Sequence, residues 1–206
     1  AILSKERLSR KKNDLGYPKK EIDWCLEYTG IKPEQLDIVA ESTINEDIMW
    51  LMLKRESDFS IEEYIKEQHE YFRQLLIVKQ KPANQLKWEY LKKLEKTRGI
   101  KEHNYDRSML TEKNFTNPRL SQKIKTKTII EHLKINPDKI RFVDHHTCHA
   151  NFAYFCSPFR NDTLILTADA FGDGLNATVS IAKGNNIKRI FSTDNCQLAR
   201  IYRYIT

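Results

Sequence analysis

The segments D-H-H-T-C-H-A at residues 144–150 and T-L-I-L-T-A-D at residues 163–169 decide the fold predicted for this chain. Residues 139–144 have the pattern of a strand, and residues 147–156 follow with helical spacing. The apolar run at 163–169 is typical of a centrally buried strand. Two strands joined by a helix are expected to be parallel neighbours whose carboxyl ends meet at one sheet edge. This order of elements predicts an α/β fold.

Three of the six histidines lie within residues 145–149, where the predicted strand turns into the helix. His145 and His149 are four residues apart, so in a helix that begins by His145 both imidazoles project from one face and can bind one ion. Asp169, at the end of the next strand, is the expected third ligand. Two histidines and one carboxylate suit Fe(II), zinc or manganese. The alternative is structural: the histidines cap the helix and fill space.

The turn after this strand offers further polar groups. Asp173 is a second, weaker candidate for binding metal or phosphate, and Gly172 and Gly174 would let the backbone approach a ligand and donate N–H groups. Cys148 and His149 are adjacent, and adjacent residues on a helix point apart. We therefore interpret Cys148 as a packed thiol and not as a nucleophile.

The remaining elements are predicted from apolar spacing, caps and turn residues. Helices are expected at 18–29, 44–52, 61–76, 84–97 and 121–133, strands at 36–40, 177–181 and 187–193, and a polar loop at 99–118. A capping box at 60–63 would start the third of these helices. The apolar run followed by the hairpin predicts that a second sheet opens in the last third of the chain.

Composition argues against several classes of protein. The chain has 6 glycines in 206 residues and contains neither a G-x-G-x-x-G nor a P-loop pattern. No apolar run approaches the ~18 residues that span a bilayer, and no signal-peptide core is visible, so we expect a cytoplasmic protein without a membrane partner. Its 4 cysteines are widely spaced and form no C-x-x-C pair, which argues against a zinc ribbon or a disulfide framework.

The formal net charge of +7 is concentrated in residues 1–20 and 92–127. In the first cluster, Arg7, Arg10 and Lys12 can converge on an anion. The second cluster could track the phosphates of a nucleic acid, but a solvated basic face is the commoner explanation and the one we favour.

Two motifs together resemble a known family. The H-H-x-x-H-A segment at 145–150, the S-P-F turn at 157–159 and the strand end at 164–174 resemble the O-carbamoyltransferases of antibiotic and nodulation-factor biosynthesis. The segment E-R-L-S-R-K-K at 6–12 and the helix after Pro18 independently resemble the opening of the same family. The resemblance is good at both ends of the chain and poor over residues 45–120.

The resemblance implies an actin-like (ribonuclease H-like) ATPase fold related to the tRNA threonylcarbamoyl transferases, here incomplete. Residues 1–160 would form the end of the first lobe, with a helical insertion at about 45–120, and residues 161–206 the opening strands of the second lobe. The family's first hairpin would precede Ala1, and the rest of the second lobe and an adenylate-forming domain would follow Thr206. We therefore expect a fragment that is inactive alone.

The function implied by the resemblance is transfer of a carbamoyl group from carbamoyl phosphate, through carbamoyl adenylate, to a hydroxyl of a small-molecule acceptor. ATP and carbamoyl phosphate would serve the full-length enzyme, with a divalent metal, Fe(II) or zinc, at His145, His149 and Asp169. Arg10 and Lys12 match basic positions that would face the anionic donor, nucleotide or carbamoyl adenylate.

The sequence departs from the family pattern at two positions. Asn13 stands where many members have a histidine, and it can orient a ligand but cannot take up a proton. Ala170 replaces the usual glycine. Two alternatives stay open: a tRNA threonylcarbamoyl-adenosine-type modification protein, and a non-catalytic binding domain. The opening motif favours a small-molecule acceptor over nucleic acid.

Overall fold

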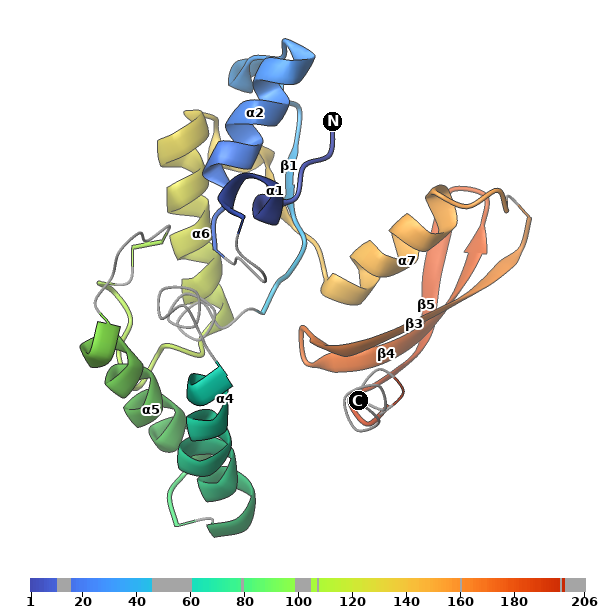
Figure 1. Ribbon diagram of the computed structural model, residues 1–206. Helices are drawn as coiled ribbons and strands as arrows, with labels where there is room; N and C mark the ends of the chain where they lie inside the picture. Colours follow the sequence, from blue (N-terminus) through green and yellow to red (C-terminus); the bar gives the residue numbers. More distant parts are fainter. Residues whose placement is uncertain are drawn as a thin grey trace. The chain divides into compact units, whose positions relative to one another are not determined.

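The computed structural model of the protein describes residues 1–10, 16–45, 61–78, 80–98, 105–106, 108–159, 161–196 and 198. Its contacts divide the chain into two units (Figure 1). The helical unit comprises Ala1–Asp37 and Asp47–Pro137, and the sheet unit comprises Ile38–Glu46 and Asp138–Thr206. The predicted lobes at residues 1–160 and 161–206 stay a prediction.

The elements follow one another in mixed order, which agrees with a mixed α/β class. The helical unit contains α1 (Lys5–Ser9), α2 (Lys19–Thr29), the 3-10 turn η1 (Pro33–Gln35), α4 (Ile61–Glu67), the π-helical segments η2 (Gln68–Phe72) and η3 (Gln74–Val78), α5 (Ala83–Arg98) and α6 (Pro118–Leu133). The 3-10 turn η4 (Pro137–Lys139) leads into the sheet unit. The sheet unit contains β1 (Val39–Glu41), β2 (Ile140–Phe142), α7 (His145–Phe155), β3 (Thr163–Gly172), β4 (Leu175–Lys183) and β5 (Asn186–Thr193).

The predicted helices at 18–29, 84–97 and 121–133 are confirmed as α2, α5 and α6. Helix α6 begins three residues earlier than predicted because Asn117 caps it by accepting a hydrogen bond from the Arg119 N–H, with Pro118 at the first helical position. The predicted helix at 61–76 is helical throughout but changes from α to π winding after Glu67. The predicted helix at 44–52 lies largely outside the described residues, as does Ser60, the first residue of the predicted capping box.

The strands form two sheets among the described residues. β1 pairs in parallel with β2, whereas β3, β4 and β5 form an antiparallel meander. The predicted meander is therefore confirmed. The prediction that residues 139–144 and 163–169 are neighbouring parallel strands is wrong, because β2 takes β1 as its partner and β3 pairs with β4.

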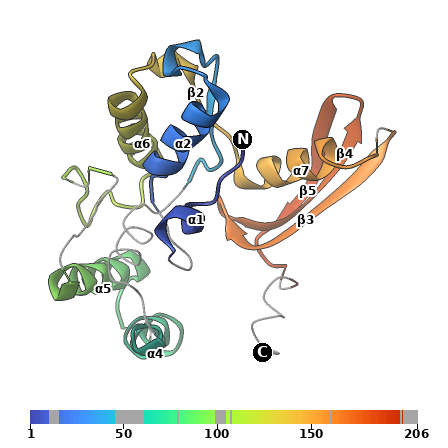
Figure 2. The same cartoon turned by 45° about the horizontal axis from the view of Figure 1, so that its top comes forward.

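Helix α7 covers one face of the three-stranded sheet, as both views show (Figures 1 and 2). The buried contact consists of Ala150 and Tyr154 from the helix against Ile165 and Ala182 from the sheet, with Ile187 at its margin. Burying a large apolar side chain of this kind contributes about 1.5–3 kcal/mol. This contact holds the helix onto the sheet.

The opposite face of β3 is exposed. Leu164 and Leu166 keep 68% and 63% of their surface accessible, whereas Ile165 is buried. The prediction of a centrally buried strand is therefore wrong within the described residues. A continuous apolar run is expected for a strand covered on both faces, but only alternate residues of β3 meet α7.

The helical unit contains a polar network that connects Tyr17 and helix α2 to helix α6. The Tyr17 hydroxyl lies 2.8 Å from Nδ1 of His132, and Nε2 of His132 lies 2.6 Å from Asp23 Oδ1. Lys19 also donates to Asp23. Partial burial raises the pKa of Asp23, but the hydrogen bonds from Lys19 and His132 outweigh burial and lower that pKa overall.

No helix among the residues that the structure describes has the length and apolar content needed to cross a bilayer.

Because the folded-state pKa of Asp23 is lowered, its ion pairs stabilise the fold above the ordinary aspartate pKa and are lost as pH falls through the lowered value. We expect Asp23→Asn to reduce the free energy of unfolding by up to about 1 kcal/mol at pH 7, since the carboxylate is half exposed. The deficit should shrink below about pH 4. Urea unfolding across this pH range tests it, with exposed Asp37→Asn as control. A deficit independent of pH would contradict the assignment.

Candidate metal centre

The first turn of α7 sets the spacing of the two outer histidines. Asp144 is the N-cap and accepts a hydrogen bond from the Thr147 N–H at 2.8 Å, so the helix begins at His145. His145 and His149 are then one turn apart and share one side of the helix. The helix predicted at 147–156 is confirmed and starts at the earlier residue that the two-histidine arrangement requires.

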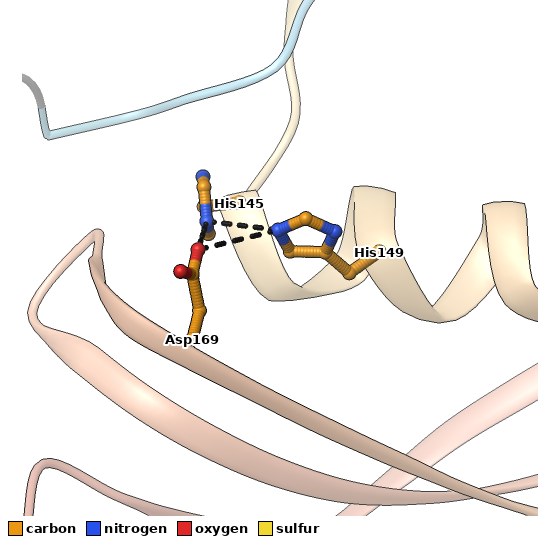
Figure 3. Close-up of side chains that lie close together, drawn as sticks. All are labelled: His145, His149 and Asp169. Carbon is orange, nitrogen blue, oxygen red and sulfur yellow. Dashed lines mark hydrogen bonds and ion pairs between the residues drawn. The ribbon is translucent and has the colours of Figure 1, made fainter. Parts of the chain in front are cut away.

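Three side chains meet in front of this turn, as Figure 3 shows. Nε2 of His145 lies 2.6 Å from Asp169 Oδ2 and 3.0 Å from Nε2 of His149. Nε2 of His149 lies 3.4 Å from the same carboxylate oxygen. One nitrogen or oxygen atom from each residue therefore occupies the corner of a small triangle, with the carboxylate 36% exposed and open to solvent.

Asp169 faces the helix because it lies on the same face of β3 as Ile165 and Thr167, which also contact α7. Pairing runs regularly to Ala168↔Ala177 and resumes only at Gly172↔Leu175. The intervening residues are irregular in the ladder, so Asp169 lies where the regular pairing of β3 with β4 ends. The proximity of Asp169 to the histidines was predicted, but the structural route is an antiparallel strand under α7 and not a shared parallel edge.

Gly172 gives the His145 ring its space. A Cβ at this residue would overlap ring atoms of His145 and lie 2.6 Å from its Nε2. Any side chain at position 172 would therefore displace the imidazole. The sequence predicted that Gly172 lets the backbone approach a ligand. That role stays a prediction, while the structure shows that the close approach is to His145.

Asp173 holds the backbone around the cluster and is not part of the triangle itself. Its carboxylate accepts hydrogen bonds from the His145 N–H at 2.7 Å, from the Thr43 hydroxyl at 2.6 Å, and from the N–H groups of Ile44 and Asn45. Burial raises the pKa of Asp173, but these hydrogen bonds outweigh burial and lower that pKa. With both oxygen atoms occupied by protein donors, Asp173 acts here as a clamp between residues 43–45 and the start of α7.

An ion pair between Arg189 and Asp144 holds the N-cap of α7 in place. Arg189, from β5, donates to the Asp144 carboxylate and to the Thr147 hydroxyl. Burial raises the pKa of Asp144, but the hydrogen bonds from Arg189 and Thr147 outweigh it and lower that pKa. Sequence reasoning missed both Arg189 and Thr43, because nothing in the local pattern connects them to residues 45 and 130 positions away.

Cys148 agrees with its interpretation as a packed thiol. Its Sγ lies 3.9 Å from the Val143 carbonyl oxygen, and burial together with nearby carboxylates raises the pKa of the thiol. A raised pKa lowers the thiolate fraction and so disfavours nucleophilic chemistry.

The other predicted anion-binding residues belong to the helical unit. Arg10 follows α1 with a left-handed backbone, φ 58°, and its N–H donates to the Glu6 carbonyl oxygen. Lys12 and Asn13 lie outside the described residues. Anion binding by Arg10, Lys12 and Asn13 therefore stays a prediction.

Comparison with known proteins gives two matches. A family model described as the carbamoyltransferase N-terminus matches residues 1–205. Nodulation protein NolNO from Sinorhizobium fredii is similar to this chain, with 26% identity over 188 residues. The aligned part makes up 91% of this chain and 20% of that protein, so the chain spans about a fifth of the length of this curated relative.

Gly172→Ala should move the His145 ring away from Asp169 and reduce the free energy of unfolding by about 1–3 kcal/mol, because overpacking forces neighbours apart. Gly184→Ala is the matched control: its φ of 57° makes alanine costly too, but no atom lies within 4 Å of the added Cβ. Histidine side-chain NMR signals separate the two. We expect only Gly172→Ala to shift the signals of His145. Unchanged His145 signals in that variant would contradict the claim that Gly172 is needed to accommodate the ring.

Proposed function

This chain belongs to the carbamoyltransferase N-terminal family, and on that basis we propose that it is the metal-binding part of a carbamoyltransferase that modifies a hydroxyl group of a small molecule. The observation that carries the proposal is the convergence of His145, His149 and Asp169 at the start of α7. Family membership supports carbamoyl transfer in general, and the side-chain triangle supports metal assistance.

The donor set suits a divalent cation. Metal–nitrogen bonds of about 2.0–2.1 Å in a tetrahedral site separate ligand atoms by about 3.3 Å. The three separations here run from 2.6 to 3.4 Å, so small side-chain rotations bring all three atoms to bonding distance of one ion. Two imidazoles and one carboxylate suit Fe(II) or zinc and leave positions open. The bound ion would supply Lewis-acid polarisation of a carbonyl or phosphoryl oxygen.

The protein groups around the triangle have distinct tasks. His145 and His149 present Nε2 lone pairs, and Asp169 contributes the negative charge that offsets part of the ion's charge. Asp173 fixes the backbone of His145, and Gly172 leaves room for its ring. The carboxylate and His149 are 36% and 52% exposed, so a carbamoyl donor and an acceptor hydroxyl can reach this side of the cluster from solvent.

The other parts of the proposal concern a protein longer than this chain, which spans about a fifth of the length of its curated relative. We propose that carbamoyl phosphate and ATP supply carbamoyl adenylate, that Arg10 and Lys12 contribute positive charge to binding of the anionic donor, and that the whole adopts an actin-like fold. The resemblance of residues 6–12 and 145–174 to the carbamoyltransferases supports these steps. Transfer of a radiolabelled carbamoyl group from carbamoyl phosphate to a hydroxyl compound by the full-length protein, with and without ATP, tests them together.

We expect the protein to bind one equivalent of Zn²⁺ or Fe(II), and His145→Ala, His149→Ala and Asp169→Asn each to weaken binding at least about 100-fold, more than outer-sphere changes do. Isothermal titration after chelator treatment, with Fe(II) handled anaerobically, measures this. His69→Ala, at an exposed histidine of η2, should bind as the unsubstituted protein does. Equal affinity in the His149→Ala variant would refute the proposed site.

A further inference from the structure

His146, the middle histidine of the cluster, points away from the triangle and into the protein. Its side chain is fully buried, with 0% of its surface exposed. Nδ1 lies 2.8 Å from the Thr167 hydroxyl oxygen, which lies 2.7 Å from the hydroxyl oxygen of Thr178. Nε2 is buried and has no hydrogen-bond partner among the described residues. The three groups therefore form a buried polar line between α7, β3 and β4.

The unpartnered nitrogen determines where the proton of a neutral His146 ring lies. Burying an N–H without an acceptor costs more than burying a bare lone pair, and orphaned buried N–H groups are rare in proteins. The proton of a neutral His146 ring therefore belongs on Nδ1, which donates to Thr167 and leaves Nε2 as a lone pair. The Thr167 oxygen then accepts from His146, and the Thr167 hydroxyl can donate its own proton to Thr178.

The contact made by His146 lies next to the metal triangle on both elements. His146 follows His145 on α7, and Thr167 lies two residues before Asp169 on β3, so the two polar contacts succeed one another along helix and strand. Arg189 and Asp173 add polar contacts at the start of α7, and further along the helix the interface with the sheet is an apolar cluster that includes Ala150 and Ala182. Apolar contacts are non-directional and tolerate sliding, whereas a buried hydrogen bond requires a defined distance and direction.

We propose that His146 is a positioning residue that fixes α7 on β3 so that His145 and His149 meet Asp169. The inference rests on the proposed function for its link to metal binding, while the positional role itself concerns the fold. The two outer histidines would hold the ion, and the middle histidine would align the helix that carries them.

Two conservative substitutions distinguish this role from simple space filling. His146→Asn keeps an N–H donor near the position of Nδ1, whereas His146→Gln carries its amide near the position of Nε2 and leaves Thr167 without its donor. Both remove the ring and should lower stability alike. Visible absorption of bound Co²⁺ measures the affinity. We expect the affinity to fall about 10- to 100-fold in His146→Gln, as it does when other outer-sphere partners of metal ligands are changed. In His146→Asn it should stay within about threefold of the unsubstituted protein.

Thr167 gives a matched pair on the strand. Thr167→Ser keeps the hydroxyl and should retain Co²⁺ affinity, whereas Thr167→Val keeps the shape, removes the acceptor and should behave like His146→Gln. Equal Co²⁺ affinity and an unchanged Co²⁺ spectrum in His146→Gln and Thr167→Val would overturn the inference. Affinities that follow only the loss of unfolding free energy, equal for the Asn and Gln variants, would also overturn it.

A metal-free measurement separates this inference from the proposed function. In a crystal structure of the His146→Gln protein without metal, we expect α7 to be displaced along β3 and the His145–Asp169 contact to be broken. An unshifted helix would refute the positional role, whatever metal the protein binds. Absence of Co²⁺ binding by the unsubstituted protein would refute the metal site instead, and the displacement of α7 would still decide the role of His146.

Discussion

The beginning of α7 is held by two carboxylates, and the candidate metal centre depends on this constraint. Asp144 accepts the Thr147 N–H, and Asp173 accepts the His145 N–H. The free N–H groups of a first helical turn carry partial positive charge, so ionised carboxylates are the partners that stabilise it best. A helix start held at two points fixes the direction in which His145 leaves the backbone, and through the helical repeat that of His149.

Three aspartates therefore lie near one helix end but have different partners. Asp144 meets Arg189 and the helix backbone, and Asp173 meets a hydroxyl and three backbone N–H groups. Asp169 meets two imidazoles. Carboxylates already surrounded by fixed donors gain little from a cation, whereas a carboxylate facing two Nε2 atoms can exchange those contacts for metal bonds. The local donor pattern therefore favours Asp169 over its two neighbours as the third ligand of the proposed metal site.

The sequence is informative about this site where the relevant geometry is local. A spacing of four places His145 and His149 together in any helix that begins by His145, and the Asp144 cap sets that beginning. Asp169 was identified through an expected parallel pairing of residues 139–144 with residues 163–169, whereas β2 pairs with β1 and β3 pairs with β4. The prediction of proximity succeeded because a helix that packs antiparallel to the following strand brings the start of the helix beside the end of that strand in either sheet topology.

The remaining supports could not be predicted from pattern. The need for glycine at position 172 comes from the position of an imidazole ring 27 residues earlier, which no turn signal encodes. Thr43 and Asp173 are separated by 130 residues, and Arg189 is one of 35 basic residues that could have paired with Asp144. The spacing of four separated His146 from the two candidate ligands, but a buried histidine and an exposed one look alike in sequence, so its burial beside Thr167 could not be predicted.

Among the described contacts that support the site, those between Asp173 and residues 43–45 join the residues that are furthest apart in the sequence. Every other described support of the cluster comes from residues 144–189, which α7 and the β3–β5 meander bring together through short connections. Residues 43–45, in contrast, follow β1, whose partner β2 directly precedes Asp144. The small parallel sheet therefore positions two supports of the site. Asp144, which caps α7, follows β2, and the hydroxyl and N–H groups that orient Asp173 follow β1. The position of His145, and with it the geometry of the candidate metal centre, is consequently coupled to the β1–β2 pair through one carboxylate.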